Sequence, residues 1–139
     1  MEIRLDGRSA LITGGSTGLG LAMAKEFALS GADVAIVGRR PEVLEEARQE
    51  ISAVAADARV HTVAADVATA EGTDLAFRST VAAFGKVDIL VNNAGKSQVG
   101  TFEEITDQIW QEDFDLKLFA AVRLARLALP AMKERRWGR

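Results

Sequence analysis

The sequence has neither cysteine nor tyrosine, and its 139 residues include one histidine and two prolines. Without cysteine there can be no disulfide framework and no thiolate chemistry, which is typical of a cytoplasmic protein. A single histidine cannot form a histidine cluster around a metal ion. Because His61 lies in the apolar stretch from Val60 to Val63, we expect it to be a structural residue of a strand, and we expect no metal site.

Long hydrophobic runs and an excess of positive charge are absent as well. No apolar stretch approaches the roughly 20 residues that cross a membrane, and residues 1–6 do not have the pattern of a signal peptide. The formal net charge of −3 offers no basic footprint for nucleic acid. Hydrophobic residues at 48% and charged residues at 27% are ordinary for a globular domain. These features favour a single domain with neither a membrane nor a nucleic acid as partner.

The most informative segment is the glycine-rich stretch Thr13–Gly20, which follows a short apolar run and precedes a helical pattern. Strand, glycine turn and helix together can bind the pyrophosphate of a dinucleotide. Gly14 allows a sharp turn, Gly18 allows close approach of the phosphates, and Gly20 allows the helix to pack tightly. A tight strand–helix connection without a ligand is the alternative. The candidate binding residues here are Gly14, Ser16, Thr17, Gly18, Leu19 and Gly20.

Strand and helix patterns alternate along the whole chain. We expect strands at Ser9–Thr13, Val34–Val37, Arg59–Ala64 and Val87–Val91. We expect helices at Gly18–Ser30, from Pro41 onward, at Thr69–Phe84 and at Thr106–Arg135, the last of them broken near Trp110–Asp113. This order predicts an α/β fold, a Rossmann-type doubly wound parallel sheet of about four strands, as one domain over residues 1–139. Its ligand site should lie beyond the carboxyl ends of the strands.

The end of the second strand indicates which dinucleotide is bound. An acidic residue at this place would bind the ribose 2′-hydroxyl of NAD, but the sequence has Gly38 there, followed by Arg39 and Arg40. A guanidinium group can bind a 2′-phosphate with paired hydrogen bonds. The sequence therefore predicts NADP(H) rather than NAD(H) as the cofactor. Solvated charge beside a helix start is the alternative.

The third and fourth strands also end in candidate binding residues. Asp66 can accept a hydrogen bond from an adenine amino group, and Val67 can lie against the ring; capping of the next helix is a second role open to Asp66. In the segment Asn92–Gly95, amide side chains can hold the loop by bonding backbone groups, and the glycine permits close approach of a cofactor. The candidates at these two ends are Asp66, Val67, Asn93, Ala94 and Gly95.

Taken together, these motifs resemble the short-chain dehydrogenase/reductase family. The resemblance rests on Thr13–Gly20, Asp66–Val67 and Asn92–Gly95, in the right order and at suitable spacing, and it covers essentially the whole chain. It implies a Rossmann fold and hydride transfer between NADP(H) and an alcohol or carbonyl, with the cofactor residues named above. Arg39 resembles the arginine of the members that prefer NADP.

The chain also departs from the family pattern. Lys117 stands where the family has an asparagine that helps to hold a water linked to proton relay; a surface lysine is the alternative. The family's catalytic serine and Tyr-x-x-x-Lys pair lie beyond a fifth strand, which is expected to begin near Arg139. We therefore expect no catalytic residue here and an inactive chain, as a fragment, a truncated gene product or half of an assembly. A non-catalytic nucleotide-binding or interaction module is the alternative function.

An edge strand and a long helix predict self-association. The strand Val87–Val91 should lie at a sheet edge, where unpaired backbone groups are a template for association. The helical segment Phe114–Arg135 is apolar on more than one side, so one stripe can cover the sheet and another needs a partner. In the resembled family this helix belongs to the main subunit interface. We expect a dimer through this helix, association through the edge, or pairing with a complementary chain. One stripe of the helix is Phe114, Leu118, Val122, Ala125 and Leu129.

Overall fold

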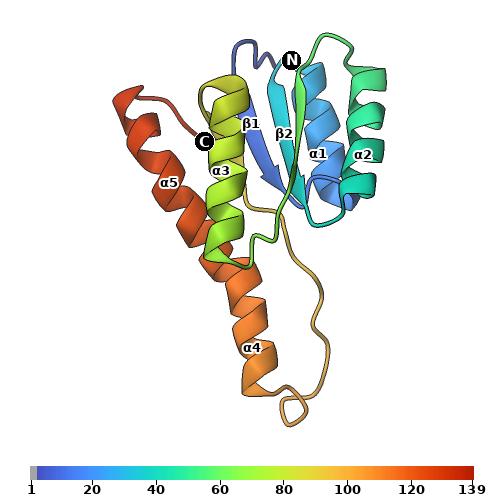
Figure 1. The fold of residues 1–139 in the computed structure, drawn as a ribbon, viewed down its shortest axis with the longest axis vertical. Helices are drawn as coiled ribbons and strands as arrows, with labels where there is room; N and C mark the ends of the chain where they lie inside the picture. Colours follow the sequence, from blue (N-terminus) through green and yellow to red (C-terminus); the bar gives the residue numbers. More distant parts are fainter. Residues whose placement is uncertain (1–2) are drawn as a thin grey trace.

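A parallel four-stranded sheet forms the centre of the computed structural model, which describes residues 3–139 (Figure 1). Its strands are β1 (Ser9–Thr13), β2 (Asp33–Gly38), β3 (Val60–Ala64) and β4 (Ile89–Val91), in the order β3-β2-β1-β4. All neighbouring strands are parallel. The Rossmann-type α/β fold predicted from the sequence is therefore confirmed.

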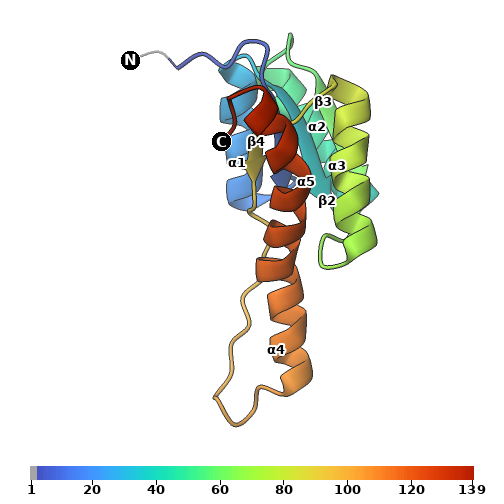
Figure 2. The same cartoon turned by 90° about the vertical axis from the view of Figure 1, so that its left-hand side faces the viewer.

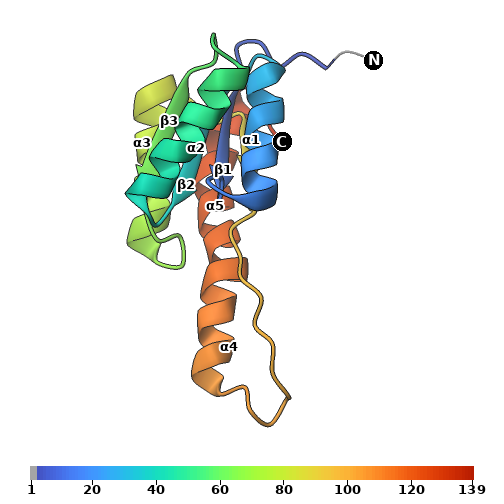
Figure 3. The same ribbon diagram turned by 90° about the vertical axis from the view of Figure 1, so that its right-hand side faces the viewer.

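Helices cover both faces of this sheet. They are α1 (Gly18–Leu29), α2 (Pro41–Val54), α3 (Ala70–Phe84), α4 (Asp107–Phe114) and α5 (Ala120–Glu134), with a π-helical turn, η1 (Asp115–Phe119), between the last two. Figure 2 shows α3 and α5 on one face, and Figure 3 shows α1 and α2 on the other. Right-handed crossovers between parallel strands place helices on the two faces in this way. No helix in residues 3–139 is long and apolar enough to cross a membrane.

The strands divide their side chains between two hydrophobic clusters. Leu11 packs in the cluster under α3 and α5, while its neighbour Ile12 packs in the cluster under α1 and α2. In β2, Val37 packs in the cluster under α3 and α5, and Ile36 packs in the cluster under α1 and α2. Successive side chains of a strand point to opposite faces, so strands covered on both faces are apolar throughout. This explains the continuous apolar runs seen in the sequence.

The ends of α3 show how local sequence sets the boundaries. Thr69 is the N-cap, and its hydroxyl oxygen accepts the N–H of Gly72 at 3.0 Å. The capping role considered for Asp66 is therefore wrong: Thr69 makes the cap. Gly85 ends the helix with a φ of 84°, and its N–H donates to the carbonyl of Val81. Glycine readily adopts this left-handed conformation. The helix ends at Phe84, as the sequence predicted.

The helical segment that the sequence predicts at Thr106–Arg135 differs from expectation at two points. The predicted break near Trp110–Asp113 is wrong, because the chain continues from α4 through η1 into α5. A π-helical turn adds a residue to a turn and so rotates the helix that follows. The buried stripe is Ala120, Leu124 and Ala128, whereas the stripe of larger residues faces solvent. Its exposed members are Phe114, Leu118, Val122 and Leu129.

Strand β4 lies at the edge of the sheet, as predicted, but it is shorter than predicted. The last residue of the chain, Arg139, pairs with this edge. Its N–H donates to the carbonyl of Asp88 at 3.0 Å, and its carbonyl accepts the N–H of Leu90 at 2.9 Å. This is the hydrogen-bond pattern of a parallel ladder. The edge of β4 is therefore partly occupied within the chain itself.

Candidate functional site

A hollow of about 430 Å³ lies at the carboxyl ends of the strands. This is the edge of a doubly wound sheet where ligands bind. Four backbone segments and one helical region surround it: the turn after β1, the end of β2, the end of β3, the loop after β4, and the region where α4 meets η1. Its volume falls in the range of small-molecule and cofactor sites.

The glycine turn leaves little room for side chains, as Gly14 and Gly20 show. Gly14 has a φ of 64°, and a Cβ there would lie 3.0 Å from Ala94 Cα. A Cβ at Gly20 would lie 2.1 Å from the carbonyl oxygen of Gly14. At these two positions the turn, the start of α1 and the loop after β4 approach one another too closely for a Cβ. Glycine is required at both positions because of close packing within the protein.

The amino end of α1 lacks a side-chain cap among the described residues. Its N-cap, Thr17, is extended, and no side chain of the described residues caps the helix. In contrast, the hydroxyl oxygens of Thr69 and Thr106 cap α3 and α4 by accepting hydrogen bonds from the backbone N–H groups of Gly72 and Ile109. The first N–H groups of a helix have no partner within it, and the helix dipole favours an anion there. The uncapped end of α1 is next to the hollow, which Ser16 and Thr17 line.

Asn93 and Thr13 tie the glycine turn to the loop after β4. The side-chain N–H groups of Asn93 donate to the carbonyls of Thr13 and Gly14, each at 3.1 Å. In return, the hydroxyl oxygen of Thr13 accepts the backbone N–H groups of Asn93 and Ala94, each at 3.0 Å. The prediction that an amide side chain holds this loop is confirmed for Asn93. This side chain is therefore used inside the protein and does not line the hollow.

The end of β2 brings two arginines to the hollow. Arg39 and Arg40 are exposed, and neither forms an ion pair within residues 3–139. Gly38 lies beside Ser16, whose Oγ would be 3.0 Å from a Cβ at Gly38. A longer side chain at this position would therefore crowd the turn after β1. Arg39 and Arg40 therefore line one end of the hollow, and the position before them holds glycine rather than an acidic residue.

The end of β3 supplies a carboxylate and an apolar surface. Asp66 Oδ1 accepts the N–H of Ala68 at 3.0 Å, which fixes the carboxylate in a local turn. Val67 is 5% exposed and belongs to the core under α3 and α5, so the edge it offers to the hollow is small. Leu116 of η1 lines the hollow as well and packs against the same core.

Most of the predicted site residues come together, and some do not. The hollow is lined by nine of them: Gly14, Ser16, Thr17, Arg39, Arg40, Asp66, Val67, Ala94 and Gly95. Gly18, Leu19, Gly20 and Asn93 are not among its lining residues. Sequence reasoning missed nine others, which are Val37, Gly38, Ala65, Ala68, Thr69, Lys96, Glu112, Asp115 and Leu116. Six of these adjoin strand ends, a signal that could have found them, whereas Glu112, Asp115 and Leu116 reach the hollow only through tertiary packing.

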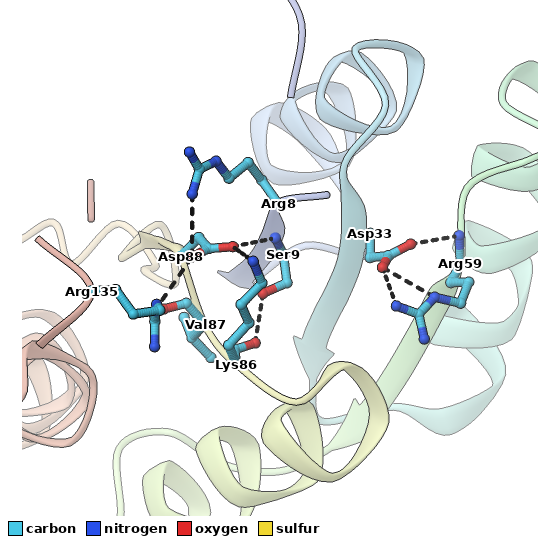
Figure 4. Close-up of polar contacts among 8 residues, drawn as sticks. All are labelled: Arg8, Ser9, Asp33, Arg59, Lys86, Val87, Asp88 and Arg135. Carbon is cyan, nitrogen blue, oxygen red and sulfur yellow. Dashed lines mark hydrogen bonds and ion pairs between the residues drawn. The ribbon is translucent and has the colours of Figure 1, made fainter. Parts of the chain in front are cut away.

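The opposite end of the sheet carries charged side chains with structural roles (Figure 4). Asp88 is fully buried, and its carboxylate accepts the N–H of Ser9 at 3.1 Å and pairs with Lys86 at 3.0 Å. Arg135 of α5 lies 3.5 Å from the same carboxylate. Asp33 and Arg59 pair separately between β2 and the start of β3. His61 bonds Ser79 at 2.8 Å, as a structural strand residue, and residues 3–139 contain no cluster of metal-ligating side chains.

The fold and the hollow define an α/β protein with a nucleotide-sized site at the strand ends. The model of the short chain dehydrogenase family matches residues 8–139. The chain therefore belongs to this family, and the resemblance seen in the sequence is confirmed. The members of this family are dehydrogenases, which are oxidoreductases.

Relatives and solved structures agree with this assignment. The uncharacterized oxidoreductase YvrD of Bacillus subtilis (strain 168) is 37% identical over 139 residues, covering 100% of this chain and 51% of the relative. The crystal structure of L-sorbose reductase from Gluconobacter frateurii, complexed with NADPH and L-sorbose, matches with a TM-score of 0.92 and 44% identity, covering 97% of this chain and 51% of that one. A metagenomic short-chain oxidoreductase in complex with NADP matches with a TM-score of 0.89 and 31% identity, covering 96% of this chain and 60% of that one. The chain spans about half the length of these relatives.

Proposed function

We propose that this chain is the NADP(H)-binding part of an oxidoreductase that transfers hydride between the cofactor and an alcohol or carbonyl compound. The observation that carries the proposal is the pair Arg39 and Arg40, exposed and without ion pairs in the described chain, beside Gly38 at one end of the hollow. Guanidinium groups bind phosphate in a paired geometry, and a 2′-phosphate distinguishes NADP from NAD.

The order of the strands gives the direction in which the cofactor would lie. The 2′-phosphate and adenosine would lie over the ends of β2 and β3, near Arg39 and Asp66. The pyrophosphate would lie at the uncapped end of α1. The nicotinamide half would then lie on the β4 side, near Ala94 and Gly95. When bound, NADPH supplies the hydride, and these residues bind and orient it.

Two related structures support this choice of cofactor. The L-sorbose reductase structure contains NADPH, and the metagenomic oxidoreductase structure contains NADP. Both match this chain over at least 96% of its length. The residues of the glycine turn, the arginine pair and the loop after β4 can be used in the same way here.

Titration calorimetry with NADPH and NADH on the purified chain tests the proposal. We expect NADPH to bind more tightly, and we expect Arg39→Ala to weaken NADPH binding by about 1.5–3 kcal/mol, the scale of a hydrogen bond to a charged group. NADH affinity should be unchanged in the variant. Arg126→Ala is a matched control, because Arg126 is also exposed and forms no ion pair within residues 3–139, but lies on α5 and does not line the hollow. Equal affinity of the wild-type chain for the two cofactors would contradict the proposal.

A non-catalytic nucleotide-binding or interaction module is the second candidate function. The 139 residues contain no tyrosine, so this part by itself does not supply the family's usual proton donor. Such a module would bind the cofactor without turnover even when combined with the remaining segment of a relative. Recovery of activity in that combination would decide for the oxidoreductase.

We also propose that the chain associates with itself or with a complementary chain. Large apolar side chains are exposed along the α4–α5 region, and monomeric proteins seldom expose contiguous apolar patches of large size. The β4 edge offers a second surface, because Arg139 pairs with part of it only. The exposed side chains are Trp110, Phe114, Leu118, Phe119, Val122 and Leu129.

A further inference from the structure

Lys117 lies in the middle of η1, next to the loop that follows β4. A Cβ placed on Gly95 would lie 3.9 Å from Lys117 Cε, which is ordinary van der Waals distance. Gly95 lines the hollow. The aliphatic stem of Lys117 therefore passes close to Gly95, which lines the hollow, although Lys117 itself is not among the lining residues.

The ammonium group of Lys117 is held by a single carboxylate one helical turn away. Its Nζ lies 2.8 Å from Asp113 Oδ1 and 3.0 Å from Asp113 Oδ2. The side chain of Asp113 is 20% exposed and that of Lys117 is 44% exposed, so the pair is partly shielded from water. An ammonium group has three N–H donors, and within residues 3–139 Lys117 has no other hydrogen-bond partner. At least one N–H is free to donate.

We propose that Lys117 binds the nicotinamide half of the cofactor. This inference rests on the proposed function, because it uses the position of the nicotinamide half on the β4 side. Asp113 orients the ammonium group, the stem passes close to Gly95, and the free N–H donates to a polar group of the nicotinamide riboside. A solvated surface lysine would need neither the oriented pair nor the contact with the wall of the site. A π-helical turn at this place agrees with a functional role, because such turns are frequent at functional sites.

Binding of two ligands, with and without nicotinamide, tests the proposal on the chain itself. NADPH contains the nicotinamide riboside, whereas adenosine 2′,5′-bisphosphate contains only the other half. For Lys117→Met we expect the Kd of NADPH to rise about tenfold, the scale of one hydrogen bond to a charged group. The Kd of adenosine 2′,5′-bisphosphate should stay the same within experimental error. Asp113→Asn should weaken NADPH selectively and to a smaller extent, because the ammonium group remains but is no longer held.

The fluorescence of the reduced nicotinamide ring gives a second readout that a general loss of structure would not reproduce. We expect the emission of bound NADPH to differ between the wild-type chain and Lys117→Met, and Lys117→Arg to restore both the affinity and the emission. Lys133→Met is the matched control, because Lys133 is exposed on the last turn of α5, at the end of this helix next to Arg135 and Asp88 and away from the hollow. Equal weakening of both ligands by Lys117→Met, or weakening of neither, would overturn the proposal. If the wild-type chain bound neither ligand, the proposed function would fail, and this inference with it.

Discussion

The side chain of Asn93 donates hydrogen bonds to the backbone of Thr13 and Gly14, which lie 80 and 79 residues before it in the sequence. It uses both of its N–H donors on the carbonyls of these two residues at the end of β1. Asn92 is adjacent, is exposed and makes no hydrogen bond in residues 3–139. Two neighbouring residues of the same type therefore have different roles. The difference comes from the direction of each side chain at the strand end.

We expect Asn93→Ala to lower the free energy of unfolding by about 1–3 kcal/mol, because partly buried carbonyls lose their donors. Cofactor binding should weaken as well, since the glycine turn is no longer tied to the loop after β4. Urea denaturation followed by circular dichroism measures the first effect, and calorimetry measures the second. Asn92→Ala serves as the control and should change the stability by less than about 0.5 kcal/mol. Equal effects of the two substitutions would contradict the role given to Asn93.

At the scale of elements, Asp88 joins three parts of the fold at the amino ends of the strands (Figure 4). Its carboxylate bonds the backbone of Ser9 at the start of β1, and it attracts Arg135 at the end of α5. Arg135 also donates to the carbonyl of Val87 at 2.9 Å. A buried carboxylate is stable only when it is paired and hydrogen-bonded. The surrounding cations therefore both neutralise Asp88 and fix the end of α5 against the sheet.

We expect Asp88→Ala to lower the free energy of unfolding by about 3 kcal/mol, since the N–H of Ser9 loses its acceptor and the cations around the carboxylate lose their counter-ion. Hydrogen exchange should increase at the end of α5, where Arg135 keeps only its hydrogen bond to the carbonyl of Val87. Asp74→Ala is the comparison, because Asp74 forms an exposed i,i+4 pair with Arg78 and should contribute about 0.5 kcal/mol or less. A loss for Asp88→Ala as small as that of the comparison would show that the cluster does not stabilise the fold.

At the scale of the whole molecule, α4 and the loop before it project beyond the carboxyl ends of the strands (Figure 1). None of the residues of α4 is buried. Its Trp110 stacks on Phe114 with ring centroids 5.7 Å apart, and both remain more than 40% exposed. A helix with exposed aromatic residues and no buried face has not satisfied its apolar surface within the chain.

Self-association should depend on this surface. We expect the chain to form a dimer or larger species as concentration rises, and we expect Leu118→Glu to shift it toward monomer, because a charge buried in an apolar contact is unfavourable. Light scattering coupled to size exclusion over a concentration series measures the change. Leu75→Glu is the control, because Leu75 is 51% exposed on α3, as Leu118 is 49% exposed on η1. A wild-type chain that stays monomeric at high micromolar concentration would contradict the expectation.

The second prediction at this scale concerns turnover. We expect the purified 139-residue chain to oxidise no NADPH with aldehydes or ketones, because hydride transfer to a carbonyl needs a proton donor and this chain has no tyrosine. An absorbance assay across a panel of carbonyl compounds measures this. Steady oxidation of NADPH that follows the protein through purification would contradict the prediction.

The sequence by itself determined the order of strands and helices, the glycine turn, and the arginine pair after β2. Each of these depends on residues that are close together in the chain. Alternating apolar patterns define strands and helices locally, and the carboxyl ends of parallel strands must meet at one edge of a sheet. The four strands and the turn at Thr13–Gly20 were therefore predictable, and the family followed from their motifs.

Only the tertiary structure decided which surfaces are buried and which side chains meet. The sequence shows several apolar stripes on the long helix, but the sheet and η1 select the one that contains Leu124. Leu116 reaches a hollow formed mostly by residues far from it in sequence, and Lys117 meets Gly95 in the same way. Arg139 pairs with β4 only because α5 returns the chain to that edge. Contacts of this kind depend on distances between elements, and a local pattern carries no information about them.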